Sequence, residues 1–391
     1  METRQHNPEG SAPTCLPAGF DWRGFGELLR GCFTPLFVRG YDEVNRRALG
    51  LCLRVVDHYG LFRDDSPEET AESMEDKIGL VPQARYILER VLTLLEEEQY
   101  ISGTTRGFVA TPKLKEGRRP GAAPPPESAA DPIFEFFARC EENFPGFFTG
   151  KKIGPGIIFA KGDRSFWEAL NGESIFFSPY AELAAFAAAE LLKPDSVVLE
   201  VGAGTGAATR RLLARVPEGV PASYVYTDIS PVFLQTGKKR FPDARFVEYK
   251  TFNMNVPPQE QGFEAGSFDL IYGVNALHVA SDLPASLAYL RTMLKPSGRL
   301  LIGEGSPPDA RRMWRPDLLF GLLEGWWNVE LDPVLRPRPG WLMPGDWRAL
   351  FESAGFANVC ALPGEDYFGS NCYGGIVIGE RPSGAAGASP G

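Results

Sequence analysis

Two ionisable residues stand at the ends of successive apolar segments in the second half of this 391-residue chain. His278 follows residues 268–274, and Glu304 follows residues 300–303. If these segments are neighbouring parallel strands, their carboxyl ends bring both side chains to one rim of a sheet. A carboxylate bonded to one imidazole nitrogen fixes the tautomer and makes the other nitrogen a better base. The alternative is a loop-capping histidine and a solvated glutamate, but the matched pair favours a general base.

A glycine-rich loop precedes this pair. The sequence EVGAGTG, residues 200–206, follows an apolar segment, and its glycines allow a tight turn and close approach of a ligand. A dinucleotide loop has its third glycine one residue later, and the acid Glu200 suits a cationic ligand better than a pyrophosphate. Asp228 ends the next predicted strand, where an acid can bind both ribose hydroxyls. The combination is similar to the S-adenosylmethionine site of class I methyltransferases, with loop capping by the two acids as the alternative.

Several longer stretches strengthen the likeness. Between about residues 165 and 380, the chain resembles the C-methyltransferase domains of polyketide synthases in motif order and spacing. The stretches are VVLEVGAGTGAAT, YVYTDISPVF, YKTFNMNVPPQEQGF, SFDLIYGVNALHVASDL, LRTMLKPSGRLLIGE and LLFGLLEGWWN. The resemblance implies transfer of a methyl group from S-adenosylmethionine to the α-carbon of a β-ketoacyl thioester on an acyl carrier protein. It also implies that His278 removes the α-proton and that Glu304 is its partner.

The resemblance further implies which residues bind the cofactor. In this sequence they are Glu200, Gly202, Gly204, Gly206, Asp228, Asn253, Met254, Asn275 and Tyr180. Asn253 stands where the family usually has an aspartate that accepts a hydrogen bond from the adenine amino group. An asparagine carbonyl can accept the same bond without the charge. No metal is expected, because no cysteine or histidine cluster has the spacing of metal ligands.

The elements that must position these residues alternate between strands and helices from about residue 176 onward. This alternation predicts a parallel sheet covered by helices on both faces, which fits the Rossmann-like α/β fold of the class I methyltransferases. Strands are expected at 197–201, 224–227, 268–274, 300–303 and, as a final edge strand, 371–379. Helices are expected at 181–192, 207–215, 232–240 and 283–294. Residues 165–380 should therefore form the catalytic domain.

Residues 19–164 are expected to form a mostly helical, winged-helix-like lid or substrate domain. The pattern of residues 82–98 predicts a helix with one apolar face, formed by Ile87, Leu88, Val91, Leu92 and Leu95. Residues 100–109 read as two short strands around a turn. A winged helix can bind DNA, but the Glu-rich helix and the net charge of −10 exclude a general nucleic-acid binder.

Composition suggests how the rest of the chain behaves. A flexible linker is expected at 113–132, with disordered ends at 1–18 and 381–391. No apolar run reaches membrane-spanning length and the start lacks the features of a signal peptide, so no membrane contact and a cytoplasmic location are expected. The six scattered cysteines then read as reduced thiols.

The substrate partner and the reaction type leave alternatives. The resemblance implies an acyl carrier protein or polyketide synthase as partner, and the lack of ketosynthase or carrier sequence suggests either action in trans on a separate carrier or a free small molecule as substrate. Lys238–Arg240 and Arg311–Arg315 are candidate basic patches for an acidic carrier. The first rival is an O-methyltransferase acting on a small phenol or enol natural product. The second is a non-catalytic methyltransferase-fold scaffold, which the retained glycines, acids and His–Glu pair argue against.

Overall fold

The computed structural model describes residues 13, 15–63, 68–117, 130–162, 164–308, 312–364, 367 and 373–383. These residues form two units. One combines the described parts of Met1–Cys32, Phe177–Asp309 and Asn328–Gly391, and the other combines those of Phe33–Phe176 and Ala310–Trp327. Each unit is thus assembled from separate segments, whereas the sequence suggested a single boundary near residue 165. Most of the predicted disordered ends, and residues 118–129 of the predicted linker, lie outside the described residues.

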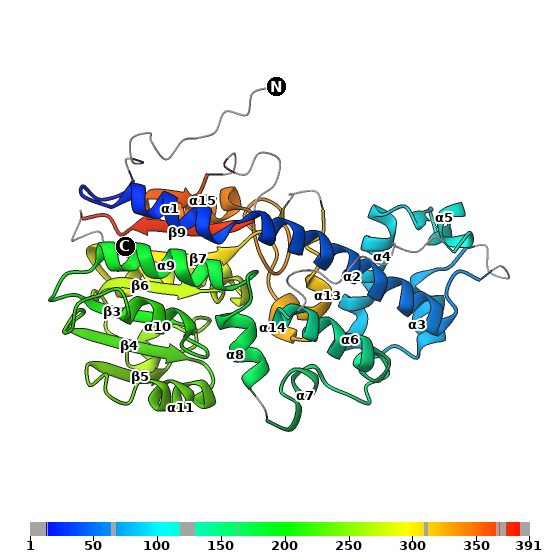
Figure 1. The fold of residues 1–391 in the computed structure, drawn as a ribbon, viewed down its shortest axis with the longest axis horizontal. Coiled ribbons are helices and arrows are strands. Elements are labelled where there is room, and N and C mark those ends of the chain that lie inside the picture. The colour runs from blue at the N-terminus through cyan, green and yellow to red at the C-terminus, as the bar shows by residue number, and fades with distance from the viewer. Residues whose placement is uncertain are drawn as a thin grey trace, which may run out of the picture. The chain divides into compact units, whose positions relative to one another are not determined.

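The first unit is built on a seven-stranded sheet with the order β5-β4-β3-β6-β7-β9-β8 (Figure 1). The strands are β3 (Val197–Val201), β4 (Ser223–Asp228), β5 (Val247–Thr251), β6 (Phe268–Val274), β7 (Leu294–Gly305), β8 (Ala357–Leu362) and β9 (Gly374–Glu380). Strands β3 to β7 pair in parallel, while β9 is antiparallel to both β7 and β8. The strand order reverses at β3, since β4 pairs with one of its edges and β6 with the other. Ligands of open α/β sheets bind at such a switch point.

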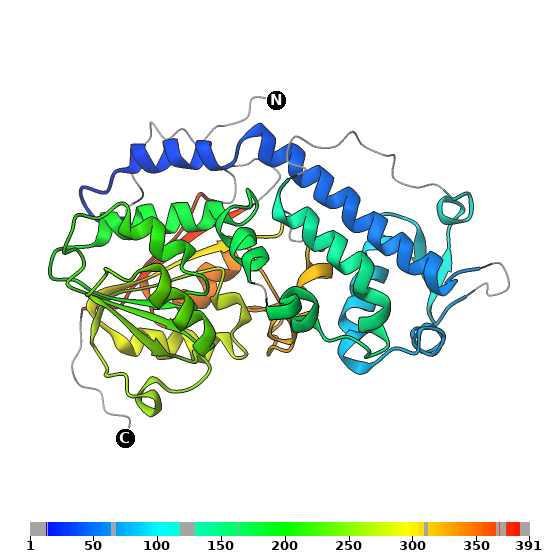
Figure 2. The ribbon, with the colours of Figure 1, turned by 60° about the horizontal axis from the view of Figure 1, so that its bottom comes forward.

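Helices cover both faces of this sheet (Figure 2). On one face lie α1 (Trp22–Cys32), α9 (Ser178–Leu191) and α10 (Ala207–Leu213), and on the other α12 (Leu283–Met293) and α15 (Pro344–Ser353). Helix α11 (Pro231–Arg240) packs on β4 and β5, and short 3-10 turns η3 (Pro258–Gln261) and η4 (Leu277–Val279) follow β5 and β6. Close packing requires a glycine on β7, because a Cβ on Gly303 would lie 2.7 Å from the carbonyl oxygen of Tyr180 in α9. The predicted α/β fold is confirmed.

The second unit is mostly helical. Its helices are α2 (Pro35–Tyr59), α3 (Ala71–Ile78), α4 (Arg85–Glu97), α5 (Pro112–Lys115), α6 (Pro132–Phe148), α7 (Gly154–Ile158), α8 (Ser165–Gly172), α13 (Asp317–Phe320) and α14 (Glu324–Trp327), with 3-10 turns η1 (Pro82–Ala84) and η2 (Ala160–Gly162). The five apolar residues predicted to share a face of α4 are all buried. The antiparallel pair of β1 (Ile101–Gly103) and β2 (Phe108–Ala110) follows α4, as the sequence predicted. No helix in the described parts of the chain is long and apolar enough to cross a membrane.

The prediction of a final edge strand is wrong. Strand β9 lies inside the sheet between β7 and β8, and its segment 376–378 is buried throughout. A continuous apolar run of this kind is what a strand with two covered faces requires. One edge is formed by β8, a short strand in which only Cys360 and Leu362 are buried and which the sequence analysis did not predict.

The expectation that all cysteines are reduced is also wrong for one pair. Cys15 and Cys360 form a disulfide that joins the N-terminal segment to β8, and Leu16 beside it is buried. Cys32, Cys52 and Cys140 are free thiols. Burial raises the pKa of Cys140 well above that of an exposed thiol, so this side chain behaves as a small apolar residue.

The disulfide should stabilise the fold through the unfolded state. The two cysteines are 345 residues apart, and the chain-entropy account gives roughly 6 kcal/mol as an upper bound for closing so long a loop. We expect a peptide map under non-reducing conditions to contain a Cys15–Cys360 cross-link, and dithiothreitol to lower Tm. Without dithiothreitol, Cys15→Ser should already have the lower Tm of the reduced wild type, and dithiothreitol should not change it. Dithiothreitol should lower the Tm of Cys32→Ser as it does that of the wild type. Failure to find the cross-linked peptide would contradict the pairing.

Candidate active site

His278 and Glu304 form a buried pair at the carboxyl rim of the sheet. The imidazole Nδ1 lies 2.7 Å from Oε2 of Glu304, and the two residues are 4% and 3% exposed. Strands β6 and β7 are neighbours, with Val274 paired to Gly303, so the residues that follow them meet at one rim. The contact predicted from the sequence is present.

The other oxygen of Glu304 holds the backbone of the histidine turn. Oε1 accepts hydrogen bonds from the N–H groups of Ala276, at 3.1 Å, and Leu277, at 2.9 Å. A single carboxylate therefore fixes both the path of the turn and the orientation of the ring. When Nδ1 donates to this carboxylate, the neutral imidazole carries its lone pair on Nε2, which makes Nε2 the basic nitrogen.

Asn275 opens the turn in a left-handed conformation with φ of 49°. Asparagine tolerates this region better than most residues with a side chain. Its N–H donates to the carbonyl of Gly303 at 2.8 Å, which ties the turn to β7. Its Oδ1 is buried and has no hydrogen-bond partner among the residues that the structure describes. A buried acceptor without a partner is costly, so this oxygen suits a ligand that donates a hydrogen bond.

The glycine-rich loop packs directly against the histidine turn. Gly202 has φ of 64°, and a Cβ there would lie 2.7 Å from the Cβ of Ala276. Gly204 has φ of 56°, but a Cβ there would meet only the Gly202 carbonyl oxygen, at 3.9 Å. The loop is therefore tight on the side of the histidine turn and open at Gly204, as a ligand cradle requires. Gly206, also with positive φ, is the N-cap of α10.

Asp228 lies at the end of β4 and supports the same loop. Its Oδ2 accepts from the N–H of Gly204 at 2.9 Å, and its Oδ1 accepts from the N–H of Ser230 at 2.8 Å. Burial is the largest influence on this carboxyl and raises its pKa, while the two backbone bonds lower it. Each carboxylate oxygen has a second acceptor position, so the side chain can hold the loop and still accept from two hydroxyls.

The side chain of Glu200 points into the protein interior. It is 1% exposed, and its Oε2 accepts hydrogen bonds from the hydroxyls of Thr209 and Tyr224, both at 2.5 Å. The Tyr224 hydroxyl lies 2.6 Å from that of Tyr272, which extends the network across β3, β4 and β6. Burial raises the pKa of Glu200 to about 7, although the hydroxyl contacts lower it. The structure thus gives Glu200 partners from the protein itself.

The remaining predicted cofactor residues occupy different surroundings. The Oδ1 of Asn253 accepts from the N–H of Asn255 at 3.0 Å, which leaves one acceptor position on that oxygen. Met254 is partly buried against the core on the α12 side of the sheet. Tyr180 is buried in α9, and its hydroxyl donates to the carbonyl of Tyr373 at 2.6 Å.

Two residues next to His278 were missed by the sequence reasoning. The Trp341 ring lies edge-on to the imidazole with centroids 6.4 Å apart, and it also packs on Tyr180 at 5.4 Å. Arg336 is 1% exposed and donates to the carbonyl of His278 at 2.7 Å. Both come from the largely irregular segment between α14 and α15, where no periodic pattern marks a residue for a site.

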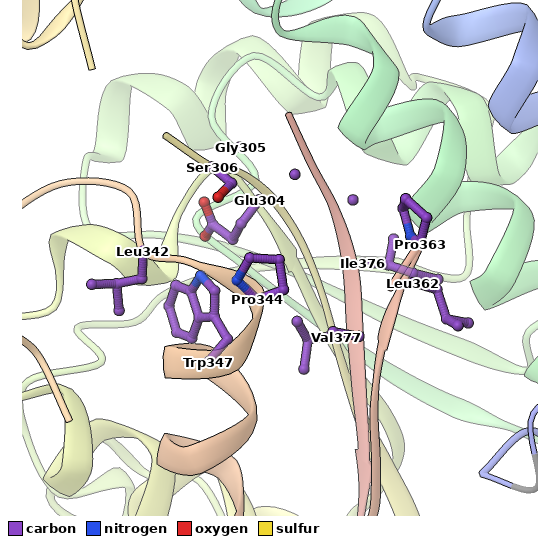
Figure 3. Close-up of a pocket in the computed structure, with 13 residues that line it drawn as sticks. Glu304, Gly305, Ser306, Leu342, Pro344, Trp347, Leu362, Pro363, Ile376 and Val377 are labelled. Carbon is purple, nitrogen blue, oxygen red and sulfur yellow. The ribbon is translucent and has the colours of Figure 1, made fainter. Parts of the chain in front are cut away.

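A pocket opens beside Glu304 (Figure 3). It is lined by Glu304, Gly305, Ser306, Leu342, Pro344, Trp347, Ala361, Leu362, Pro363, Gly374, Gly375, Ile376 and Val377. Figure 3 shows the Glu304 and Ser306 side chains together, with the indole of Trp347 on one side and the ring of Pro363 on the other. The carboxylate side of the His–Glu pair therefore borders a small, mainly apolar space.

Comparisons with known proteins agree with this site. Residues 199–300, which run from β3 into β7, match the family profile described as "Methyltransferase domain". The chain carries an S-adenosylmethionine-dependent methyltransferase domain. The predictions of this enzyme class and of its cofactor are confirmed, and the roles of individual residues remain predictions.

Relatives of this methyltransferase domain include parts of much larger proteins. The highly reducing polyketide synthase gloL of Glarea lozoyensis is 28% identical over 325 residues, which cover 82% of this chain and 12% of the synthase. The methyltransferase calH of Penicillium decumbens is 37% identical over 169 residues, which cover 42% of this chain and 44% of calH. The chain thus spans only a small part of the synthase and less than half of calH.

Solved structures share the fold of the methyltransferase domain and of the helical unit. The CurJ carbon methyltransferase superposes with a TM-score of 0.79 at 23% identity, covering 92% of this chain and 97% of CurJ. A trans-methyltransferase CalH in complex with SAH gives a TM-score of 0.58 at 22% identity, covering 87% of this chain and 90% of that one. The predicted combination of a helical region and a class I methyltransferase sheet is therefore a known fold.

The two candidate basic patches differ in how far their charged groups are exposed. Lys238 and Lys239 are exposed at the end of α11. Arg315, by contrast, is buried in the helical unit and forms ion pairs with Glu97 and Glu98. Within the second predicted patch, Arg315 is therefore not available to bind a partner protein.

Glu200 should make stability depend on pH. Its pKa of about 7 lies above the value of 4.5 for a free glutamate, so the folded protein keeps a proton that the unfolded chain releases. Stability from this group is full below about pH 4.5 and falls as the pH rises to 7, by on the order of 1.4 kcal/mol per unit of pKa difference. Urea unfolding of the cofactor-free protein at pH 5 and pH 7.5 should show a smaller loss for Glu200→Gln than for the wild type. The exposed Glu352→Gln is the control, and equal losses in all three proteins would refute the assignment.

Proposed function

We propose that this protein methylates the α-carbon of a β-ketoacyl, polyketide-type thioester, with His278 as the general base. The observation that supports this most directly is the His278–Glu304 pair, buried next to a glycine-rich cofactor loop. The bond from Nδ1 to Glu304 leaves Nε2 to act as base and stabilises the imidazolium that forms when a proton is taken.

The chemistry of such a substrate suits an imidazole base. An α-proton between a ketone and a thioester is already acidic, so an imidazole can remove it without a stronger base. S-adenosylmethionine supplies an electrophilic methyl group when bound. His278 accepts the α-proton, Glu304 balances the new positive charge, and the proton then passes to solvent. Holding the reactants in place supplies much of the remaining rate gain.

Residues around the glycine-rich loop fit the cofactor. The open face at Gly204 gives room for close approach, and Asp228 has acceptor positions for two ribose hydroxyls. The unpartnered Oδ1 of Asn275 offers an acceptor beside the histidine turn, and Asn253 has one left for an adenine amino group. Glu200 would support the loop from beneath it through its bonds to Thr209 and Tyr224.

The substrate is proposed to arrive on an acyl carrier protein or a polyketide synthase. The relatives that match include polyketide synthases, and a structural neighbour is titled a trans-methyltransferase. Carrier proteins are typically acidic, so this chain, with its net charge of −10, needs a local basic surface to bind one. The exposed Lys238 and Lys239 are candidates for that surface.

The reaction can be tested with a β-keto thioester, offered both free and bound to a carrier protein, together with ¹³C-methyl-labelled S-adenosylmethionine. Mass spectrometry should show addition of one methyl group, and the ¹³C chemical shift should place that methyl on carbon. A methyl on oxygen would refute the proposal and favour an O-methyltransferase. Absence of cofactor binding by calorimetry would instead favour a scaffold.

The role of His278 can be tested separately. His278→Ala should lower kcat by at least about 100-fold, because the general base is lost, while the Kd for S-adenosylmethionine stays near that of the wild type. His58, exposed in α2, provides the control, and His58→Ala should keep full activity. Full turnover by His278→Ala would exclude it as the base.

A further inference from the structure

We infer that Arg336 is a positioning residue that holds the carbonyl groups of the His278 loop, as Glu304 holds the N–H groups of the same loop. The inference rests on the proposed role of His278 as the base. It assigns to the segment between α14 and α15 a part in catalysis that neither the sequence motifs nor the comparisons indicate.

The guanidinium of Arg336 binds three carbonyls within four residues. Nη2 donates to His278 at 2.7 Å, and Nη1 donates to Ala280 at 2.5 Å and to Ser281 at 3.3 Å. No carboxylate accepts a hydrogen bond from Arg336 among the residues that the structure describes. The side chain is therefore committed to the loop that carries the base.

Arg336 is itself held by a compact turn. Its N–H and carbonyl pair with the carbonyl and N–H of Asp332, at 2.9 and 3.0 Å. The Asp332 carboxylate accepts from the N–H groups of Val334 and Leu335, which closes the turn. The N–H of Glu330 donates to the carbonyl of Ser281 at 2.7 Å. Backbone and side-chain bonds thus join residues 330–336 to residues 278–281.

Burying a guanidinium is costly unless its donors are satisfied. Nη1 and Nη2 of Arg336 donate to the loop carbonyls, while its buried Nε has no partner among the described residues. Arg336 is 1% exposed, and burial lowers its pKa to about 10, so the group stays charged near neutral pH. Its planar fork reaches the three carbonyls from fixed directions, which the single ammonium of a lysine does not reproduce. Loss of the fork would leave buried carbonyls of the loop unpaired and free the turn to shift.

A matched residue separates positioning from general stability. Arg381 also donates to two backbone carbonyls, that of Thr292 at the end of α12 and that of Leu294 at the start of β7, whereas Glu304 lies near the end of β7. Arg381→Ala removes the same kind of contact from the same unit without touching the histidine loop.

Kinetics should distinguish the two arginines. Arg336→Ala should lower kcat by about 100-fold, the loss expected for a displaced catalytic group, with the Kd for S-adenosylmethionine changed by less than about threefold. Millimolar guanidinium should restore part of that kcat, and methylammonium should not. Arg381→Ala should have a lower Tm than the wild type, but a kcat within about twofold of the wild-type value. Arg336→Ala with wild-type kcat would overturn the inference.

A spectroscopic readout tests the same claim without relying on turnover. The chain has three histidines, so ¹⁵N-histidine NMR can assign His278 by its loss in His278→Ala. The wild type and Arg381→Ala should show one tautomer with the proton on Nδ1, and Arg336→Ala should show a broadened signal or a tautomer mixture. If Arg336→Ala does not fold, Arg336→Lys takes its place, with a smaller change in the same direction expected.

The outcomes separate this inference from the proposed function. A wild-type spectrum without the Nδ1–H tautomer would overturn the base assignment and the inference together. A normal wild-type spectrum that is unchanged in the Arg336 variant would overturn the inference alone.

Discussion

The carboxylate of Glu304 satisfies three donors from the neighbouring strand end: the N–H groups of Ala276 and Leu277, and Nδ1 of His278. This arrangement depends on the register between β6 and β7, in which Val274 pairs with Gly303 and leaves Glu304 one residue beyond. A slip of one residue would turn the carboxylate to the other face of the sheet. Strand pairing in the core therefore determines whether the histidine has a partner at all.

The cofactor loop depends on the same turn. Gly202 has no room for a side chain because Ala276 lies against it, so the loop after β3 and the turn after β6 are packed as one surface. Asp228 fixes the outer part of the loop through the N–H of Gly204, and Glu200 lies below it in a hydroxyl network. Placing His278 and the glycine-rich loop at the ends of adjacent strands limits their relative motion, as the proposed catalytic role of His278 requires.

Much of this site could be predicted from local patterns. Apolar segments at regular intervals, a glycine loop after the first strand and two ionisable residues after neighbouring strands were enough to bring His278 and Glu304 together. The inward direction of Glu200 also follows from the two-residue period of a strand, because Leu199 and Val201 face the core on the α12 side.

The other features depend on contacts between distant parts of the chain. Arg336 and Trp341 come from a largely irregular segment, so no period marks them, and only the folded chain places them beside His278. The Cys15–Cys360 bond joins residues from opposite ends of the sequence. Which of the last two strands forms the sheet edge is decided by the antiparallel return of β9 onto β7. A single sequence carries little information about such choices.

The central claim is that the His278–Glu304 pair removes a proton from the carbon that becomes methylated. It is tested most directly by measuring the exchange of the α-hydrogen of a β-keto thioester for deuterium in D₂O. NMR monitors the exchange, and SAH takes the place of S-adenosylmethionine so that no methyl transfer occurs. The wild-type protein should accelerate exchange above the buffer rate, and both His278→Ala and Glu304→Gln should lose most of that acceleration. Equal acceleration by the wild type and His278→Ala would contradict the account.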